Sequence, residues 1–494
     1  MMRAILLRES RLCGSQVRLE EPRVRVFPLP NYMATENMSS LLANVQRHAS
    51  AWFASLPSRP VRATTTADEL RRNLGGPLPE NGSSAESVAG LLVQAGMTGT
   101  VATAGPRYFG FVVGGSVPAA VAADWLVSAW DQNAGVYAQS PLVSVVEQIA
   151  GSWLKELAGL PAGMSFGFVT GAHMANFTGL AAGRHRVLRE AGWDAESEGL
   201  FGAPPIEVVV SEEAHYTIST ALRLLGLGSN RVRRIPSDDH GRMRADELAA
   251  AVRGSKSKGP CIICAQAGNV NTGACDPLPE IAGIARERGA WLHVDGAFGL
   301  WAAASPKHAA LVRGVEQANS ITTDAHKWLN VPYDCGIVFC ADQAAHRAAM
   351  TLAAAYIVSS GSERDPHEFV PEESRRARAV PVYAALRSMG RHGYAELVDR
   401  NCRQARRFAE GLRAAGFEVL NQVELNQVLV SFGTPEQTQR TIAAVQEDGT
   451  CWCGGTVWKG RAAMRISVSN WSTTDEDVER SLEAIIRAAR IAAG

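Results

Sequence analysis

The stretch from Trp291 to Cys335, WLHVDGAFGLWAAAS…SITTDAHKWLNVPYDC, contains two short apolar runs that each end in charged residues. Asp295 follows the first run, and the pair His326 and Lys327 follows the second. Short apolar runs of this length, with flanking glycines and turn residues, are typical of buried strands. We therefore expect an acid and a lysine at the ends of two strands.

Similar runs recur between Gly105 and Val380 and alternate with segments of helical periodicity. Near-continuous apolar strands separated by helices indicate a mostly parallel sheet that is covered by helices on both faces, which is the α/β class. The predicted strands are FGFVTG, IEVVVSEEA, VRRIP, CIICAQAG, WLHVDGA, SITTDA and CGIVFC, and two of the predicted helices are ELAAAVRG and LPEIAGIARERG.

The chain is too long for one ordinary core, so several domains are expected. We predict a disordered extension over residues 1–35 and an N-terminal helical arm over 36–104. A large α/β domain follows over 105–380, and a smaller C-terminal α+β domain occupies 381–494, where helices and the strands FEVL, NQVLVSFG and MRISVSNW alternate.

Composition narrows the class of protein. The 494 residues are 46% apolar and 20% charged, and 49 basic residues balance 49 acidic ones. A balanced charge gives no general attraction to nucleic acid or to an anionic membrane surface, and no apolar run approaches a membrane span. The nine cysteines include Cys261 and Cys264 but complete no zinc set, so we expect reduced thiols, no metal and a cytoplasmic protein.

A lysine and a carboxylate at strand ends are what a pyridoxal phosphate (PLP) enzyme requires. The lysine carries the cofactor as a Schiff base, and the acid keeps the pyridine nitrogen protonated so that the ring accepts electrons. Lys327 and Asp295 are the candidates, because ligands of open α/β sheets bind beyond the carboxyl ends of the strands. The alternatives are a solvent-exposed lysine and a carboxylate that caps a helix starting at Gly296.

Further candidates lie at other strand ends. His215 follows a strand, and its imidazole can stack flat on an aromatic ring. Thr170, Gly171, Ala172 and His173 form a strand-to-helix turn whose free amides would bind an anion such as a phosphate. This turn does not fit GxGxxG, which disfavours a dinucleotide fold. Arg465 interrupts an apolar strand and must pair with a carboxylate, either of a substrate or of the protein.

Together these residues resemble the group II PLP-dependent amino-acid decarboxylase family, which includes the aromatic-L-amino-acid and glutamate decarboxylases. The resemblance runs from about Trp52 to the end, and HVDGA…DAHKWLNVPYDCG is its most specific part. It implies the PLP-dependent transferase (aspartate aminotransferase-like) fold and a homodimer with a site completed across the interface.

The resemblance also implies roles for individual residues. Lys327 would bind the cofactor, Asp295 would pair with the pyridine nitrogen, His215 and Ala297 would pack on the two faces of the ring, and Arg465 would bind the substrate carboxylate. Val270 and His173 depart from the family pattern, because other members of the family commonly have hydroxyl residues at these two positions. The remaining implied cofactor contacts are Thr170, Gly171, Ala172, His173, His326 and Asn271, and the implied proton donor is Tyr356.

The predicted function is α-decarboxylation of an L-amino acid to an amine and CO₂. The aromatic residues Phe109, Phe111 and Trp130 slightly favour an aromatic or apolar substrate, with Phe109 and Phe111 in contact with it. Acidic and diamino substrates stay open. So do other PLP reactions on the same fold (aldehyde synthase, aldolase, aminotransferase), and so does a catalytically silent partner subunit.

Overall fold

The computed structural model describes residues 37–351, 361 and 363–493. The predicted extension over 1–35 and the predicted proton donor Tyr356 lie outside the described residues. The chain divides into two compact units, of which one comprises residues up to 51 together with 67–97, and the other comprises 52–66 and 98–494.

The first unit consists largely of three helices, α1 (Met38–Ser55), α2 (Ala67–Leu74) and α3 (Ala85–Gly99). None of the three helices contains a fully buried residue. Large apolar side chains are exposed on α1 and α3, among them Leu42, Leu91 and Leu92. Within the described part of this unit, these helices therefore leave apolar side chains exposed.

The second unit is built around a seven-stranded sheet of order β1-β7-β6-β5-β4-β2-β3. All pairs are parallel except those of β7, which runs antiparallel to β1 and β6 because the segment from β6 to β7 contains no crossover helix. The mostly parallel sheet is thus confirmed. Its strands are β1 (Ser165–Val169), β2 (Glu207–Ser211), β3 (Arg233–Ile235), β4 (Cys261–Gln266), β5 (Trp291–Asp295), β6 (Ser320–Asp324) and β7 (Gly336–Cys340).

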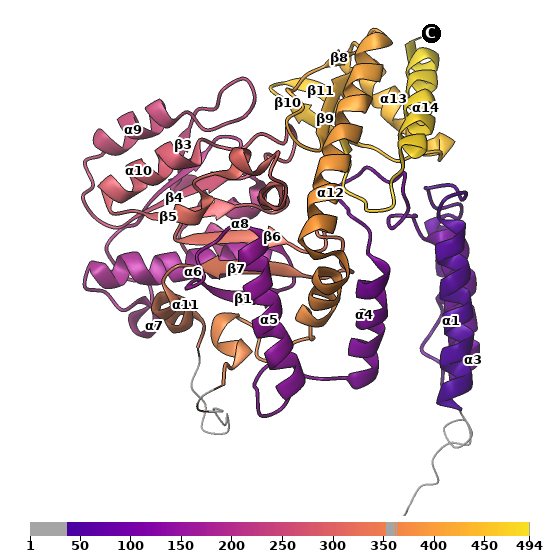
Figure 1. Ribbon diagram of the computed structural model, residues 1–494, viewed down its shortest axis with the longest axis horizontal. Helices are drawn as coiled ribbons and strands as arrows, with labels where there is room; N and C mark the ends of the chain where they lie inside the picture. Colours follow the sequence, from indigo (N-terminus) through magenta and orange to yellow (C-terminus); the bar gives the residue numbers. More distant parts are fainter. Residues whose placement is uncertain (1–36, 352–360, 362, 494) are drawn as a thin grey trace, which may run out of the picture. The chain divides into compact units, whose positions relative to one another are not determined.

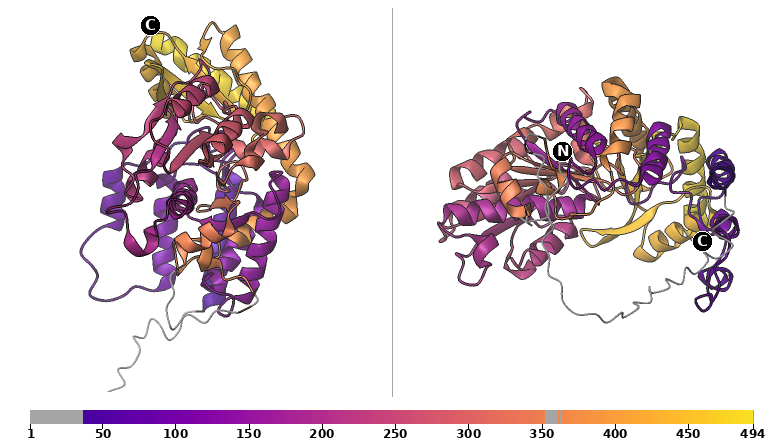
Figure 2. Two further views of the ribbon diagram at one scale, coloured as in Figure 1. Left: turned by 90° about the vertical axis from the view of Figure 1, so that its left-hand side faces the viewer. Right: turned by 90° about the horizontal axis from the view of Figure 1, so that it is seen from below.

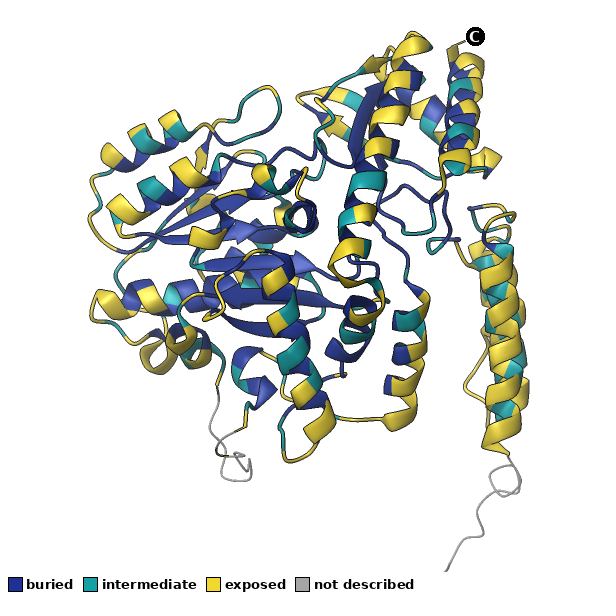
Figure 3. Cartoon of the chain, in the orientation of Figure 1, coloured by how far each residue is buried: buried dark blue, intermediate teal, exposed yellow. Residues whose placement is uncertain are grey.

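Helices cover both faces of this sheet (Figures 1 and 2). One face packs on α6 (Ala172–Glu190), α8 (Tyr216–Leu224) and α11 (Gln343–Met350). The other packs on α5 (Pro141–Leu157), α9 (Ala245–Arg253), α10 (Leu278–Arg288) and part of α12 (Ala379–Ala414). Figure 3 shows the strands buried between layers of helices whose outer surfaces are exposed.

Side chains of each strand alternate between two cores. In β4, Ile263 belongs to the core beside α10, whereas Ile262 and Cys264 belong to the core beside α6. Cys261 faces the α10 side, so the two cysteines of the CxxC point to opposite faces as expected. Burial raises the pKa of Cys261 to about 11, which keeps this thiol protonated.

The C-terminal part contains a four-stranded antiparallel sheet of order β10-β11-β9-β8. Its core is separate and includes Phe408, Ile466 and Leu482. Helix α12 contributes to both cores, and Gly390 interrupts its helical backbone geometry. Sequence patterning missed β10, whose GGTVW is glycine-rich. The elements are β8 (Glu418–Val419), β9 (Gln427–Ser431), β10 (Gly454–Trp458), β11 (Arg461–Ser467), α13 (Pro435–Asp448) and α14 (Asp475–Ala493).

Shorter elements connect these parts. They are α4 (Pro118–Trp130), α7 (Ala195–Glu198) and the 3₁₀ helices η1 (Ser229–Arg231), η2 (Gly299–Ala304), η3 (Ala309–Val312), η4 (Val315–Gln317) and η5 (Pro366–Phe369). Within the described part of the chain, no helix is both long enough and apolar enough to cross a membrane.

Candidate active site

A pocket of about 240 Å³ lies at the carboxyl ends of β4, β5 and β6, beside the start of α6. Parallel strands bring their carboxyl ends to one edge of a sheet, so residues distant in sequence meet here. Eight residues predicted from the sequence line this pocket, namely Gly171, Ala172, His173, His215, Asp295, Ala297, His326 and Lys327.

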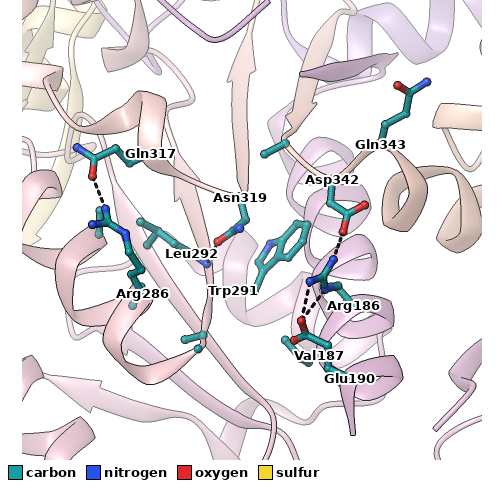
Figure 4. Close-up of a pocket in the computed structure, with 15 residues that line it drawn as sticks. Arg186, Val187, Glu190, Arg286, Trp291, Leu292, Gln317, Asn319, Asp342 and Gln343 are labelled. Carbon is teal, nitrogen blue, oxygen red and sulfur yellow. Dashed lines mark hydrogen bonds and ion pairs between the residues drawn. The ribbon is translucent and has the colours of Figure 1, made fainter. Parts of the chain in front are cut away.

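A larger cavity of about 620 Å³ lies at the opposite edge of the sheet, where β5 and β6 begin (Figure 4). Its charged side chains have partners within the lining. Arg186 contacts Glu190 at 2.6 Å and Asp342 at 2.5 Å, and Arg286 donates a hydrogen bond to Gln317. Among the residues that the structure describes, no lysine, histidine, cysteine or serine lines it. The smaller pocket is therefore the candidate active site.

Lys327 reaches the pocket from the loop after β6. Its Nζ lies 2.8 Å from Oδ2 of Asp324, the last residue of β6. The other oxygen of Asp324 accepts a hydrogen bond from Ala172 N at 2.5 Å, so this carboxylate joins the lysine to the start of α6. The segment around Gly114 packs tightly on the lysine backbone, since a Cβ there would lie 1.8 Å from Lys327 O. The predicted site had not included Asp324.

Asp295 ends β5 and is buried, with 7% of its surface exposed. Its Oδ1 accepts a hydrogen bond from Ala297 N and its Oδ2 accepts one from Asn176 Nδ2, both at 3.1 Å. The carboxylate thus caps its own turn and also faces the pocket. Among the described residues no basic side chain forms an ion pair with it, which leaves it available to an N–H group of a ligand.

His215 is the N-cap residue of α8. Its Nδ1 accepts hydrogen bonds from Thr217 N and lies 2.8 Å from Thr217 Oγ1, so its proton resides on Nε2. Burial lowers the pKa of His215, the charge of Asp295 opposes this shift, and the charges of Lys327 and Arg465 add to it. The imidazole is therefore neutral at physiological pH and donates through Nε2.

His326 is fixed at the rim of the pocket. Its Nδ1 accepts a hydrogen bond from Cys335 N at 3.0 Å, and its ring stacks on Tyr333 with a centroid distance of 4.2 Å. Burial lowers the pKa of His326, so the imidazole is a neutral donor through Nε2, which lies 3.5 Å from Asp324 Oδ1.

Arg465 lies on β11 and contributes its charge to the environment of His215. Within the described ranges, no carboxylate pairs with its guanidinium. Burial lowers the pKa of Arg465. A structural ion pair, one of the two alternatives from the sequence, is therefore wrong for this part of the chain. A half-buried guanidinium without an anion is ready to bind one.

Several predicted contacts lie elsewhere. Phe109 is buried in the C-terminal core, where its ring packs edge-on against Phe408, so its assignment to substrate binding is wrong. Phe111 is 62% exposed and stacks on Trp452. The Asn271 side chain accepts a hydrogen bond from Thr456 Oγ1 of β10 and does not line the pocket. Thr170 does not line it either.

Gln266 lines the pocket and was not predicted from the sequence. It ends β4, its register partner on β5 is Asp295, and its Nε2 is buried without a hydrogen-bond partner among the described residues. An unpaired buried amide is costly, and it marks a position where a ligand supplies the missing acceptor. Only the tertiary pairing of β4 with β5 identifies this residue.

The pocket thus combines an amine, a carboxylate without a cation, an unpaired amide donor, and a wall formed by the small residues Gly268 and Ala297. This set fits a flat heteroaromatic cofactor that carries an aldehyde, a ring nitrogen and an anionic group, which defines a PLP-dependent enzyme. Among the described residues no cluster of His, Cys, Asp and Glu is arranged to hold a metal.

Comparison with known proteins identifies the family. Residues 68–434 match the family model described as the pyridoxal-dependent decarboxylase conserved domain, and the chain belongs to this family. It is a PLP-dependent carboxy-lyase that acts on amino acids.

Similar proteins agree with this family. An aromatic-L-amino-acid decarboxylase of Bacillus atrophaeus is 28% identical over 86% of this chain and 89% of its own length. An L-2,4-diaminobutyrate decarboxylase of Rhizobium meliloti is 31% identical over 76% of each chain. The crystal structure of Oryza sativa TDC with PLP and tryptamine superposes with a TM-score of 0.86 at 22% identity, covering 94% of this chain and 99% of that one, which shows the shared fold.

Proposed function

We propose that this enzyme decarboxylates an L-amino acid with an aromatic or apolar side chain, with Lys327 as the residue that binds PLP. One observation carries the assignment of the site: Lys327 and Asp295 line the same pocket, at the ends of neighbouring strands. They do not pair with each other, because Lys327 contacts Asp324 instead. Asp295 would pair with the pyridine nitrogen, while His215 and Ala297 would contact the two faces of the ring.

The anionic end of the cofactor would bind beside the start of α6. Gly171, Ala172 and His173 line this side, and helix α6 begins at Ala172. Ala172 N already donates to Asp324, so the next amides of the first turn, beginning with that of His173, are suited to a phosphate. The neutral donor His326 lies on the same side. The unpaired amide of Gln266 would supply a further hydrogen bond at the wall beside β4.

Arg465 would bind the carboxylate that leaves as CO₂. PLP supplies the electron sink for the bond that breaks, and which bond breaks depends on how the protein orients the substrate. A guanidinium that holds the carboxylate on the His215 side would direct that bond out of the plane of the ring. The proposed role of Tyr356, protonation of the product carbon, stays a prediction.

The aromatic preference rests on side chains near the pocket. Tyr216 lines the pocket and is 70% exposed, and Tyr333, stacked on His326, is 59% exposed. The two carboxylates in the lining, Asp295 and Asp324, already have roles toward the ring nitrogen and Lys327, which leaves neither for the second amine of a diamino acid.

We also propose a cytoplasmic homodimer with a site completed across the interface. The apolar side chains of α1 and α3 that are exposed within their own unit support it, because contiguous apolar surface often marks a protein–protein contact. A catalytically silent subunit would not need an intact set of lysine, acid and unpaired guanidinium.

The test is to incubate the yellow holoenzyme with a panel of L-amino acids and to follow CO₂, amine, aldehyde and ammonia together. The panel includes aromatic and aliphatic amino acids, L-2,4-diaminobutyrate and L-aspartate. Amine with stoichiometric CO₂ from an aromatic or apolar member supports the proposal. Preferred turnover of diaminobutyrate or aspartate contradicts the substrate class, and aldehyde with ammonia, or aldehyde with glycine, contradicts the reaction.

A further inference from the structure

Asn176, on α6 behind the pocket wall, contacts two of the residues that the proposed function places on the cofactor. The side chain is fully buried. Its Nδ2 donates to Asp295 Oδ2 at 3.1 Å and to Thr217 Oγ1 at 3.3 Å. Both amide hydrogens are therefore used, one toward the proposed partner of the pyridine nitrogen and one toward the residue that holds His215.

The orientation of this amide is determined by its neighbours. An ionised carboxylate can only accept hydrogen bonds, so the nitrogen of Asn176 must face Asp295. Its Oδ1 then faces Thr322 Oγ1 at 2.7 Å and His293 Nε2 at 2.9 Å, and both must donate. Neither assignment can be reversed without placing two acceptors together.

The same constraint determines the tautomer of His293. With its proton on Nε2, its Nδ1 accepts from Ser320 Oγ at 2.8 Å, and Ser320 Oγ accepts from Trp291 Nε1 at 2.8 Å. Burial lowers the pKa of His293 to about 3, so the ring is neutral. A chain of donors therefore runs in one direction from Trp291, in the wall of the larger cavity in Figure 4, to Asp295.

A branch of this chain reaches His215. Thr217 Oγ1 accepts from Asn176, so its own hydrogen is free to donate to His215 Nδ1, 2.8 Å away. This leaves the His215 proton on Nε2. One amide thus sets the rotamer of Asp295 and the tautomer of His215.

We infer that Asn176 is a positioning residue of the active site. It fixes the orientations of Asp295 and His215 relative to each other, and it is itself oriented by neutral His293. This inference rests on the proposed function, since it takes Asp295 and His215 as cofactor contacts. Without the amide, the buried Asp295 carboxylate loses one of its two hydrogen bonds and gains rotational freedom. Binding the cofactor must then order this side chain, which weakens the affinity for PLP.

The first test replaces Asn176 by Leu, which has a similar shape and no hydrogen-bonding groups. Hydrogen bonds to charged groups are worth about 1.5–3 kcal/mol, so the dissociation constant for PLP, measured by fluorescence titration of the full-length apoenzyme, should rise roughly 10- to 100-fold. The visible circular dichroism of the bound cofactor should also weaken. Unchanged affinity and unchanged dichroism would overturn the inference.

A pair of substitutions at His293 separates orientation from packing, and it applies even where Asn176→Leu does not fold. In His293→Gln, the side-chain amide can still donate to Asn176 and accept from Ser320, so PLP affinity and dichroism should stay within about threefold of wild type. His293→Leu fills similar space but cannot donate, and should lose affinity roughly tenfold. Equal losses in both variants would mean that the residue acts by packing alone.

Two more variants complete the design. Thr217→Val cuts only the branch to His215, so it should alter the dichroism more than the PLP affinity. Asp295→Ala tests the proposed function itself. If Asp295→Ala leaves PLP affinity and spectrum unchanged, the cofactor site is wrong. If Asp295→Ala impairs both but Asn176→Leu and His293→Leu do not, the site stands and the positioning role of Asn176 is wrong.

Discussion

The two cavities at opposite edges of the central sheet differ in how their polar groups are satisfied. In the larger one, of about 620 Å³, Arg186 pairs with Glu190 and Asp342, and Arg286 donates a hydrogen bond to Gln317. The smaller one, of about 240 Å³, contains Gln266 with an unpaired amide and Asp295 without a cation, and it lies near the unpaired Arg465.

The comparison indicates that unsatisfied polar groups are a better guide to a candidate active site than cavity volume is. Folded proteins pair nearly all their buried polar groups, so the unpaired amide of Gln266 in the smaller pocket indicates a position reserved for a ligand. Substituting matched residues at the two edges tests this conclusion, because the same chemical change should have opposite functional consequences.

The largest effect is expected for Lys327→Ala. Removing the proposed cofactor lysine should lower kcat by at least about 10³-fold, as losses of other covalent catalytic groups do, and should abolish the visible absorbance of the holoenzyme. Lys307→Ala is the control, because this exposed lysine pairs with Asp399, away from the residues that line the pocket. A yellow, active Lys327→Ala protein would contradict the assignment.

Asp295→Asn should follow, with kcat lower by roughly 10²-fold, because an opposite charge shifts the pKa of a neighbouring group by about 1–3 units and its loss leaves the pyridine nitrogen less protonated. The matched change in the larger cavity is Asp342→Asn. That residue pairs with Arg186 and caps α11, a role that Asn also fills, so kcat should change by less than about twofold. Similar losses at both positions would remove the distinction between the two edges.

Arg465→Met should raise KM for the amino acid by roughly 10- to 100-fold, the value of a charge-assisted hydrogen bond to a carboxylate. Its counterpart is Arg186→Met, which removes a cation already satisfied by Glu190 and Asp342 and should leave KM unchanged. Steady-state kinetics with the best substrate from the panel measures both. An unchanged KM in Arg465→Met would exclude carboxylate binding by this residue.

The smallest effect concerns stability against pH. The folded-state pKa of His293 is about 3 because of burial, below the unfolded value of about 6.5, so the unfolded chain binds a proton that the native one does not. Stability from this residue is fully present above about pH 6.5 and falls by about 1.4 kcal/mol per pH unit between pH 6 and 4. His293→Gln should flatten the pH dependence of the unfolding free energy, measured by denaturant titration, by that amount. A slope equal to that of wild type would show that His293 is protonated in the native state.

Local pattern was sufficient to predict the sheet and the residues at its strand ends. Apolar runs and turn residues identified all seven strands, and Lys327, Asp295 and His215 follow such runs directly. The strand β10 was missed because its glycines resemble a turn, and Phe109 was misassigned because an aromatic residue in a core and one in a pocket look alike in sequence.

The supporting residues could not be predicted in this way. Asn176 lies in the middle of α6, and Gln266 occupies an otherwise apolar strand, so neither shows a local signal of function. Their roles arise from the pairing of β4 with β5 and from the packing of α6 on the sheet, which bring their amides to Asp295 or to the pocket. Local sequence does not encode such contacts.

The most direct measurement is borohydride reduction of the holoenzyme, which fixes the cofactor to its lysine, followed by proteolysis and mass spectrometry. The pocket at the carboxyl edge of the sheet predicts a phosphopyridoxyl group on Lys327 and on no other lysine. A label on Lys155, Lys307 or Lys459 in place of Lys327 would contradict the location of the site.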